Sequence, residues 1–320
     1  MTPKEAKKQK VLALFIVILL FVFIGVLFLA VSINNKTRTE NLRIKVLELK
    51  KDRELAQKIT KIKTATSSLP EISSKSYLTL AIANSGKEKV LLSQESNLPL
   101  PIASLTKLMV ATIVLENAQP ETLITGNLDY IGLEESAFIL EVNKTYTVKE
   151  LLTSALISSD NDSARLLSSI LGETDFLAKM NQKAKDLGMT QTAYTNITGL
   201  DPKDLSTGIN TSSVNDLAKL VVYIKNKHPE IFKITSEAQY NFCDINNFCK
   251  QILNTNKLLE DKDLKFKIIG GKTGSTDLAG KNLILLTQIS PEIYLLNIVL
   301  GSKDNFMDTK SLINNVIIEN

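Results

Sequence analysis

The first seventy residues divide into an apolar stretch, a charged stretch and a short polar stretch. Residues 11–31 carry no charged side chain over about 21 positions, so as a helix rising about 1.5 Å per residue they reach roughly 30 Å, the thickness of a bilayer core. We therefore predict a transmembrane helix over residues 11–33. A cleaved signal peptide is the alternative, but its apolar region is usually only about 7 to 15 residues, and no clear A-x-A site follows.

Four lysines precede the apolar stretch: Lys4, Lys7, Lys8 and Lys10. The positive-inside rule places residues 1–10 in the cytoplasm and sends the chain after the span across the membrane. The pattern thus predicts a single-pass protein of the cell membrane, with an extracytoplasmic domain.

Residues 34–63 are rich in charge and free of Gly and Pro. Their apolar positions recur at mixed intervals of three and four residues: Leu42, Val46, Leu49, Leu55, Ile59 and Ile62. This spacing indicates a helical stalk, with a short coiled coil as the alternative. A polar linker follows, marked by Ser67, Ser68, Pro70, Ser73 and Ser74. We expect the stalk and linker over 34–74 and one folded domain over 75–320.

The folded domain is predicted to open with a β-hairpin. Apolar and small residues alternate over 76–84, Ser85-Gly86-Lys87 indicates a turn, and a second apolar run covers 89–92. After Pro101, apolar positions recur with helical period: Leu105, Leu108, Met109, Ile113 and Val114. Ser104 is therefore expected at or near the first turn of a largely buried helix.

Lys107 follows Ser104 by three positions, so both side chains are expected on one face of that helix. An amine at this spacing can approach the serine hydroxyl, and burial in apolar surroundings lowers the pKa of an ammonium, which allows it to act as a base. A helix cap beside a lysine that extends to solvent is the purely structural alternative.

A second polar segment, Ser158–Asp162, lies between two apolar helical patterns, the first of which opens with a capping box from Thr147 to Glu150. As structure, it caps a helix that begins near Ser163. As chemistry, the Ser159 hydroxyl can relay a proton, and the Asn161 amide can hold a substrate carbonyl.

A third segment runs from a short apolar strand into small residues: Lys272, Thr273, Gly274 and Ser275. Flanking glycines let a ligand lie along the strand edge, as in strand addition. Lys272 and Thr273 offer a cation and a hydroxyl to an anionic group. The backbone N–H groups of Ser275 and Ser104 are candidates for the two halves of an oxyanion hole.

Composition excludes several other kinds of site. The net charge of +4 is spread along the chain without a basic block interleaved with aromatics, which argues against nucleic-acid binding. The only histidine, His228, stands in a polar, helix-ending stretch and is expected to be solvated, so neither a Ser-His-Asp triad nor a His-built zinc site is favoured. We predict no metal and no cofactor.

The two cysteines, Cys243 and Cys249, bracket a turn-tolerant Asn-Asn pair. Outside the cytoplasm they can form a disulfide across the ends of a hairpin, which we favour. Two free structural thiols are the alternative.

The motifs S-x-x-K, S-D-N and K-T-G, in this order, form the set shared by penicillin-binding proteins and class A β-lactamases. From about Ser76 to Leu312 the chain most resembles the low-molecular-mass D-alanyl-D-alanine carboxypeptidases, the DacA-like peptidases of family S11. The resemblance also rests on residues 101–107, 180–201, 254–259 and 271–280. It implies an α+β fold in which a helical cluster packs on an antiparallel sheet, with the site in the cleft between them.

The resemblance also implies roles for residues and partners. Ser104 is expected as the nucleophile, Lys107 as its base, and Ser159 with Asn161 as the opposite wall. Lys272 and Thr273 are expected to anchor the carboxylate of a peptidoglycan stem peptide ending in D-Ala-D-Ala. The same site is expected to be acylated by β-lactam antibiotics such as penicillins.

The chain departs from the family pattern at one position. Relatives carry a carboxylate-binding arginine just before the last helix, where this chain has Asn305, with Lys303 nearby. The alternatives are therefore a DD-endopeptidase, a catalytically weak wall-binding module and a class A-like β-lactamase. The last would need a glutamate-bearing loop, whereas residues 194–199 show no E-x-x-L-N pattern.

Overall fold

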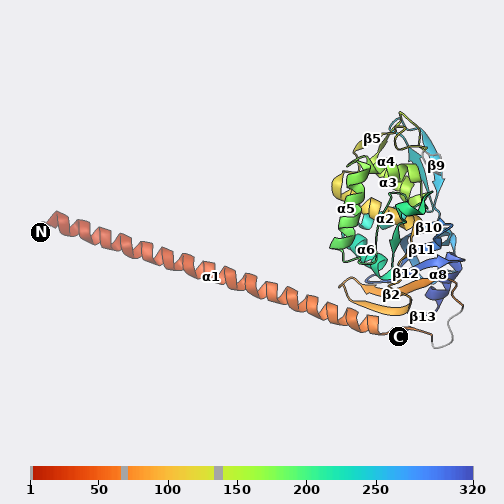
Figure 1. Ribbon diagram of the computed structural model, residues 1–320. Coiled ribbons are helices and arrows are strands. Elements are labelled where there is room, and N and C mark those ends of the chain that lie inside the picture. The colour runs from red at the N-terminus through yellow and green to blue at the C-terminus, as the bar shows by residue number, and fades with distance from the viewer. Residues whose placement is uncertain (1–2, 66–70, 133–139, 320) are drawn as a thin grey trace. The chain divides into compact units, whose positions relative to one another are not determined.

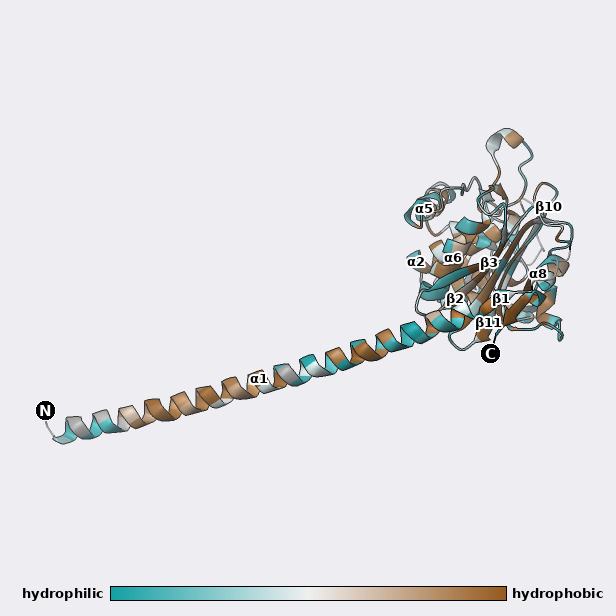
Figure 2. Cartoon of the chain, turned by 90° about the horizontal axis from the view of Figure 1, so that it is seen from below, coloured by the Kyte–Doolittle hydropathy of each residue, from teal (hydrophilic) through white to brown (hydrophobic). Residues whose placement is uncertain are grey.

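The computed structural model describes residues 3–65, 71–132 and 140–319. The chain forms two compact units, Met1–Ala56 and Gln57–Asn320. Helix α1, Pro3–Thr60, forms the first unit up to Ala56, and its last turn belongs to the second (Figure 1). The predicted transmembrane helix and the beginning of the predicted stalk are parts of this one helix. Its residues 11–31 are apolar on all sides (Figure 2), with Phe28 78% exposed, and the helix is long and apolar enough to cross a membrane.

The stalk ends differently from the expectation. Helix α1 stops at Thr60, and strand β1, Ile62–Thr64, pairs antiparallel with β13, Val316–Ile318. The end of the predicted stalk is therefore a strand on the folded domain. Ser67, Ser68 and Pro70 of the predicted linker lie outside the described residues.

Helices and strands alternate through the second unit. The further helices are α2 (Thr106–Asn117), α3 (Val148–Ile157), α4 (Asn161–Ser168), α5 (Glu173–Asp186), α6 (Val214–Lys227), α7 (Pro229–Thr235) and α8 (Asn305–Asn314). Short 3₁₀ turns are η1 (Ala103–Leu105), η2 (Leu205–Thr207) and η3 (Lys257–Glu260). The short strands are β4 (Leu100–Pro101), β5 (Leu123–Thr125), β6 (Thr145–Thr147), β7 (Thr211–Ser212), β8 (Gln239–Cys243) and β9 (Cys249–Leu253). The longer ones are β2 (Ser76–Ala83), β3 (Glu88–Gln94), β10 (Lys267–Thr276), β11 (Gly280–Ser290) and β12 (Ile293–Ser302).

The largest sheet in the described part of the chain is antiparallel, with strand order β10-β11-β12-β2-β3. Strands β2 and β3 are the predicted hairpin. Both faces of the central strands are buried, because helix α8 packs on β11 and β12 while α6 packs on β12 and β2. Figure 1 shows the sheet between α8 and the larger helical group. The α+β fold predicted from the sequence is confirmed, and β10 remains at the edge of the sheet.

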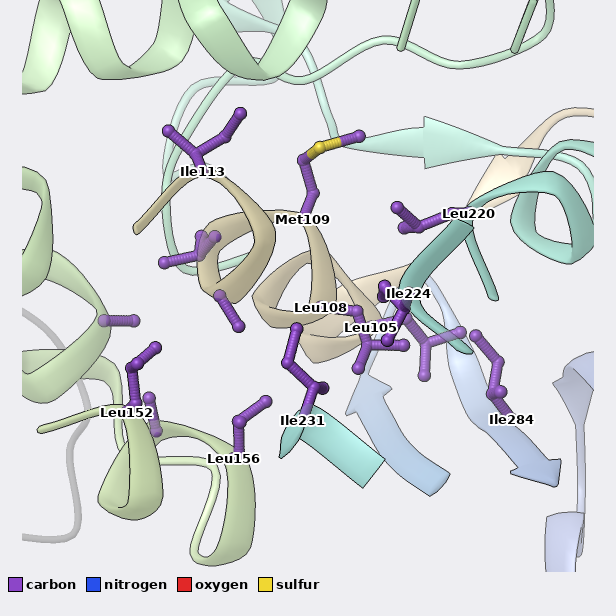
Figure 3. Packing of buried hydrophobic residues seen from close by; sticks show 14 of the residues in the cluster. Leu105, Leu108, Met109, Ile113, Leu152, Leu156, Leu220, Ile224, Ile231 and Ile284 are labelled. Carbon is purple, nitrogen blue, oxygen red and sulfur yellow. The ribbon is translucent and has the colours of Figure 1, made fainter. Parts of the chain in front are cut away.

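The hydrophobic core surrounds helix α2, whose residues from Thr106 to Val114 are all buried. Leu108 and Met109 are wholly enclosed, and side chains from α3, α6, α7 and β11 converge on the helix (Figure 3). Fully burying a side chain of this size contributes about 1.5–3 kcal/mol. Helix α2 is thus a fixed support for the residues at its N-terminus.

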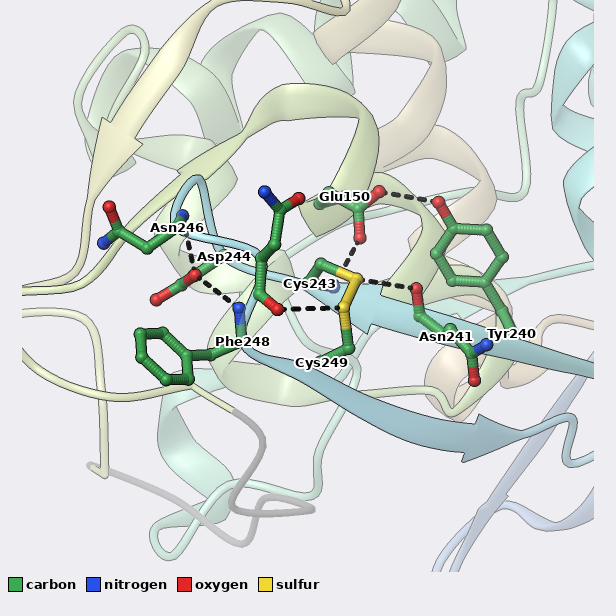
Figure 4. The surroundings of a disulfide bond; sticks show 9 residues. Glu150, Tyr240, Asn241, Cys243, Asp244, Asn246, Phe248 and Cys249 are labelled. Carbon is green, nitrogen blue, oxygen red and sulfur yellow. Dashed lines mark hydrogen bonds between the residues drawn. A yellow bond between two sulfur atoms is a disulfide. The ribbon is translucent and has the colours of Figure 1, made fainter.

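The two cysteines are joined: Cys243 and Cys249 form a disulfide across the ends of β8 and β9 (Figure 4). Glu150 holds this ribbon through the Tyr240 hydroxyl (2.6 Å) and the Cys243 N–H (2.9 Å). The capping box is therefore only half formed. Thr147 Oγ1 accepts from the Glu150 N–H, but the Glu150 carboxylate turns to the ribbon instead of back to Thr147.

His228 is not the solvated residue that we expected. Its side chain is only 13% exposed, and its ring nitrogens lie 3.6 Å from carboxylate oxygens of Glu116 and Glu230. It joins α6 to α7.

Candidate active site

Ser104 lies in the 3₁₀ turn η1, directly before helix α2, which agrees with its predicted place at or near the first turn. Ala103 adopts a φ of 48°, in the left-handed region, which turns the chain sharply ahead of Ser104. A second chain segment packs against this bend at Gly199. A Cβ at that position would lie 2.0 Å from the Ala103 carbonyl oxygen, so only glycine permits the approach.

Lys107 is 1% exposed, and its ammonium is surrounded by oxygen acceptors. Nζ donates to Ser104 Oγ (2.8 Å), to Asn161 Oδ1 (2.7 Å) and to the Thr198 carbonyl oxygen (2.9 Å). These three acceptors match the three protons of an ammonium and fix its position. The lysine does not extend to solvent, so the structural alternative of a snorkelling side chain is wrong.

The S-D-N segment forms the wall opposite Ser104. Asp160 caps α4 by accepting from the Ser163 N–H at 2.8 Å, so this helix begins at Asn161, two residues earlier than expected. Ser159 adopts a φ of 62°, an unfavourable conformation for a serine that the cap holds in place. Its hydroxyl accepts a hydrogen bond from Lys272 Nζ at 2.9 Å.

Lys272 is the second buried lysine, also 1% exposed. Burial, and then the charge of Lys107, hold the pKa of Lys272 well below its usual range. Its Nζ also donates to the Thr273 carbonyl oxygen at 3.1 Å. Two like charges in one buried site repel each other, so the pair holds one positive charge more readily than two.

The K-T-G strand lies against the serine turn. A Cβ on Gly274 would stand 2.8 Å from the Ile102 carbonyl oxygen and 3.0 Å from the Ser104 nitrogen, so glycine is required for this contact. Ser275 follows and is exposed, while Thr273 is half-buried. The structure thus brings the three predicted segments into one site at the exposed edge of β10.

Some residues of the site carried no sequence signal. The carbonyl of Thr198, a main-chain group, holds Lys107, and it is fixed by Asn196, whose Oδ1 accepts from the Gly199 N–H at 2.7 Å. Asn210 is 1% exposed and ties this loop to α2, donating to Thr106 Oγ1 at 3.0 Å. Only the family pattern around Gly199 pointed to this loop.

Two further residues at the edge of the site were not predicted. Thr255 Oγ1 lies 2.5 Å from Thr273 Oγ1. Asp201 accepts hydrogen bonds from the Thr276 hydroxyl (2.7 Å) and the Leu278 N–H (2.9 Å), joining the loop after Gly199 to the far end of β10.

Asn305, the position at which we expected a departure from the family pattern, is turned inward. It is 4% exposed and donates through Nδ2 to the Asn282 carbonyl oxygen at 2.8 Å. Lys303, its neighbour, is exposed. Asn305 is therefore engaged with the β11 backbone.

Comparison with known proteins agrees with the geometry. Residues 63–304 match the family described as D-alanyl-D-alanine carboxypeptidase, peptidase S11. The chain is 34% identical to a D-alanyl-D-alanine endopeptidase of Haemophilus influenzae, over 62% of this chain and 66% of that protein. It is 30% identical to the D-alanyl-D-alanine carboxypeptidase DacB2 of Mycobacterium tuberculosis, over 64% of this chain and 68% of that protein.

A solved structure shows the same fold. Penicillin-binding protein D2 of Listeria monocytogenes, with ampicillin bound, superposes with a TM-score of 0.65 at 28% sequence identity. The superposition covers 77% of this chain and 98% of that one.

Proposed function

Because this chain belongs to the S11 family of D-alanyl-D-alanine carboxypeptidases, we propose that it trims peptidoglycan stem peptides through an acyl-enzyme on Ser104. The observation that carries the proposal is the contact of 2.8 Å between Lys107 Nζ and Ser104 Oγ inside a buried site. A lysine that has no route to solvent can exchange a proton only with the groups around it. The hydroxyl of Ser104 is the reactive one among these groups.

In the acylation step, the neutral Lys107 amine takes the Ser104 proton while Oγ attacks the carbonyl carbon of the D-Ala-D-Ala bond. The tetrahedral oxyanion is held by backbone N–H groups at Ser104 and Ser275. Collapse breaks the C–N bond, and the leaving nitrogen takes up a proton to depart as free D-Ala. Water then attacks the ester, which restores the Ser104 hydroxyl and releases the shortened stem.

The opposite wall supplies the second proton path. The Ser159 hydroxyl, which accepts from Lys272 Nζ at 2.9 Å, can relay to the leaving nitrogen the proton that Lys107 took from Ser104. Asn161 Oδ1 accepts from Lys107 Nζ, which fixes this amide beside Ser104, and an amide N–H there can hold a substrate carbonyl. These roles make Ser159 and Asn161 catalytic together with Ser104 and Lys107.

Helix α1 is apolar enough to span a membrane. We propose that it anchors the chain with residues 1–10 in the cytoplasm, because Lys4, Lys7, Lys8 and Lys10 precede the span. The catalytic domain then lies outside the cytoplasm, where its peptidoglycan substrate is. A disulfide between Cys243 and Cys249 is compatible with that compartment.

A second candidate reaction is the DD-endopeptidase cleavage of cross-links. It is favoured by Asn305, whose side chain is engaged with the Asn282 carbonyl oxygen and offers no cation to a small terminal residue. Purified muropeptides distinguish the two reactions. The carboxypeptidase releases D-Ala from a monomeric pentapeptide, whereas the endopeptidase converts a cross-linked dimer to monomers.

The proposal is tested by fluorescent penicillin labelling of the detergent-solubilised full chain, together with D-Ala release. We expect labelling of wild type, none of Ser104→Ala, and a fall of at least about a hundredfold in labelling rate for Lys107→Ala, since a general base contributes about 10²–10⁴-fold. Labelling that survives in Ser104→Ala would falsify the nucleophile assignment. Rapid turnover of a chromogenic cephalosporin would instead indicate a β-lactamase.

A further inference from the structure

A cavity of about 330 Å³ lies between the sheet and the place where α6 meets α7. Pro229 and Phe232 line it from α7, Ile269 and Leu286 line it from β10 and β11, and Tyr294 lines it from β12. Among the described residues that line this cavity, none belongs to the active site. A hollow of this size with a mostly apolar lining is typical of a binding site for a small molecule.

The walls of the cavity are fixed by close packing. Phe232 is 2% exposed and Leu286 is wholly buried. Helix α7 is held to β10, because the Gly271 N–H donates to Thr235 Oγ1 at 3.1 Å and a Cβ on Gly270 would lie only 2.6 Å from the Phe232 carbonyl oxygen. A ligand that enters a preformed cavity orders few protein groups, so little of its binding free energy is lost.

Lys225, in the last turn of α6, brings a positive charge to the cavity. Its Nζ lies 4.5 Å from the centroid of the Tyr294 ring and donates to Asn84 Oδ1 at 2.8 Å. Within the described ranges of the chain, no carboxylate forms an ion pair with this ammonium. An ammonium has three protons to donate, so Lys225 can still donate to a ligand.

A lysine elsewhere in the helical cluster shows the same arrangement with an anion added. Lys183 Nζ lies 5.0 Å from the centroid of the Tyr223 ring, and it also donates to Glu116 Oε1 at 2.8 Å. Burial disfavours the charge of Lys183, but Glu116 outweighs that effect and the pKa of Lys183 is raised. Burial lowers the pKa of Lys225, which has no such partner. A carboxylate beside Lys225 would offset the cost of burying its charge.

Two amides stand at the same polar end of the cavity. Asn84 follows β2 and Asn226 follows Lys225, and both asparagines are exposed. Amide N–H groups donate to carboxylate oxygens, as the ammonium does. The cavity therefore combines one cation and two amides at one end with an apolar lining elsewhere.

We propose that this cavity binds a small organic acid, with the carboxylate on Lys225 and an apolar body against Phe232 and Ile269. The charge of Lys225 selects an anion, and the apolar lining selects a ligand that has more than an anionic group. The site is separate from the Ser104 site and goes beyond the proposed peptidase activity. A hydrogen bond to a charged group is worth enough to change affinity by about tenfold or more, so its loss is measurable.

The test compares hydrocinnamate, a phenyl ring joined to a carboxylate by a short chain, with its uncharged primary amide. Ligand-observed NMR titration gives both Kd values for the full chain in lipid nanodiscs, and empty nanodiscs correct for partition into lipid. We expect the acid to bind about tenfold or more tightly than the amide. Lys225→Met, which keeps the apolar stem, should weaken acid binding about tenfold and change amide binding less than twofold.

Lys227 provides a matched control, because it is an exposed lysine of the same helical turn that does not line the cavity. Lys227→Met removes the same charge and should leave both Kd values unchanged. Lys225→Arg keeps a cation and should retain most of the preference for the acid. If Lys225→Met lowers the unfolding midpoint, Lys225→Gln provides the same comparison.

The outcomes separate this site from the Ser104 site. Equal binding of acid and amide, no binding of either, an unchanged acid Kd in Lys225→Met, or acid binding that disappears after incubation with penicillin would overturn the proposal. An acid preference that depends on Lys225 and persists after that incubation would support it. This result would stand even if the protein released no D-Ala, so the failure of the proposed function would be seen separately.

Discussion

Replacing Gly199 by alanine should disable acylation without unfolding the protein. Gly199 has a φ of +83°, and a Cβ there would lie 2.0 Å from the carbonyl oxygen of Ala103 and 2.5 Å from its carbonyl carbon. Ala103 is the residue before Ser104 and is itself held at a φ of 48°. The obstacle is backbone, so it cannot be relieved by a side-chain rotation.

The expected losses of acylation rate and of stability follow from this geometry. Real Cβ atoms essentially never come within 3.0 Å of such a neighbour, so the Ala103–Ser104 turn and the loop of Gly199 must separate by about 1 Å. A displacement of about 1 Å of a reacting group costs roughly a hundredfold in rate. The positive φ adds a loss of about 1–2 kcal/mol in the free energy of unfolding, because alanine is strained in that region.

Gly86 provides the control, since its φ of +81° is nearly the same and nothing lies within 4 Å of a Cβ at that position. Gly86→Ala should lose about 1–2 kcal/mol in urea unfolding, and Gly199→Ala should lose more, because the clash with the Ala103 backbone adds to the same φ strain. In stopped-flow acylation by a fluorescent penicillin, Gly199→Ala should be slowed about a hundredfold and Gly86→Ala by less than twofold. A wild-type rate for Gly199→Ala, or equal slowing of both variants, would refute the argument that this contact positions Ser104.

Two other predictions concern stability. The free energy of unfolding should rise with pH between the lowered pKa of folded Lys272 and its unfolded value of about 10.4, because in that window the unfolded chain binds a proton that the folded chain has released. Lys272→Met should reduce this slope, measured by urea unfolding between pH 7 and 9.5. An unchanged slope would contradict a depressed pKa. Replacing Cys243 and Cys249 by serine, which opens a loop of sequence separation 6, should lower the free energy of unfolding by about 2 kcal/mol with penicillin labelling retained, and an unchanged stability would exclude a role for the disulfide in stability.

The sequence predicted those elements that are determined by residues close together in the chain. The β2–β3 hairpin follows from alternation and the turn at Gly86, and helix α2 follows from the period of its apolar residues. The pairing of β1 with β13 could not be predicted in this way. Each strand is three residues long, and the two are brought together from opposite ends of the domain.

The same division holds in the site. Motif residues could be named because their side chains carry the chemistry, whereas the Thr198 carbonyl is a backbone group that any residue could provide. Glu150 matched the capping-box pattern, but its carboxylate accepts hydrogen bonds from the Tyr240 hydroxyl and the Cys243 N–H instead of from Thr147. Thr255 lies in the run 254–259 that carries the family resemblance, but it was given no role in the site, because a threonine next to two asparagines also describes an ordinary turn.

The reactivity of the site depends on a relation between two lysines that are far apart in the sequence. Lys107 has three oxygen acceptors, whereas Lys272 has Ser159 Oγ and the Thr273 carbonyl oxygen, and the charge of Lys107 lowers the pKa of Lys272. Burial and the charge of Lys107 both favour loss of the Lys272 proton. The S-x-x-K spacing places the Lys107 amine beside the Ser104 hydroxyl, and the packing of Gly274 against the Ser104 turn brings the K-T-G strand to the same site.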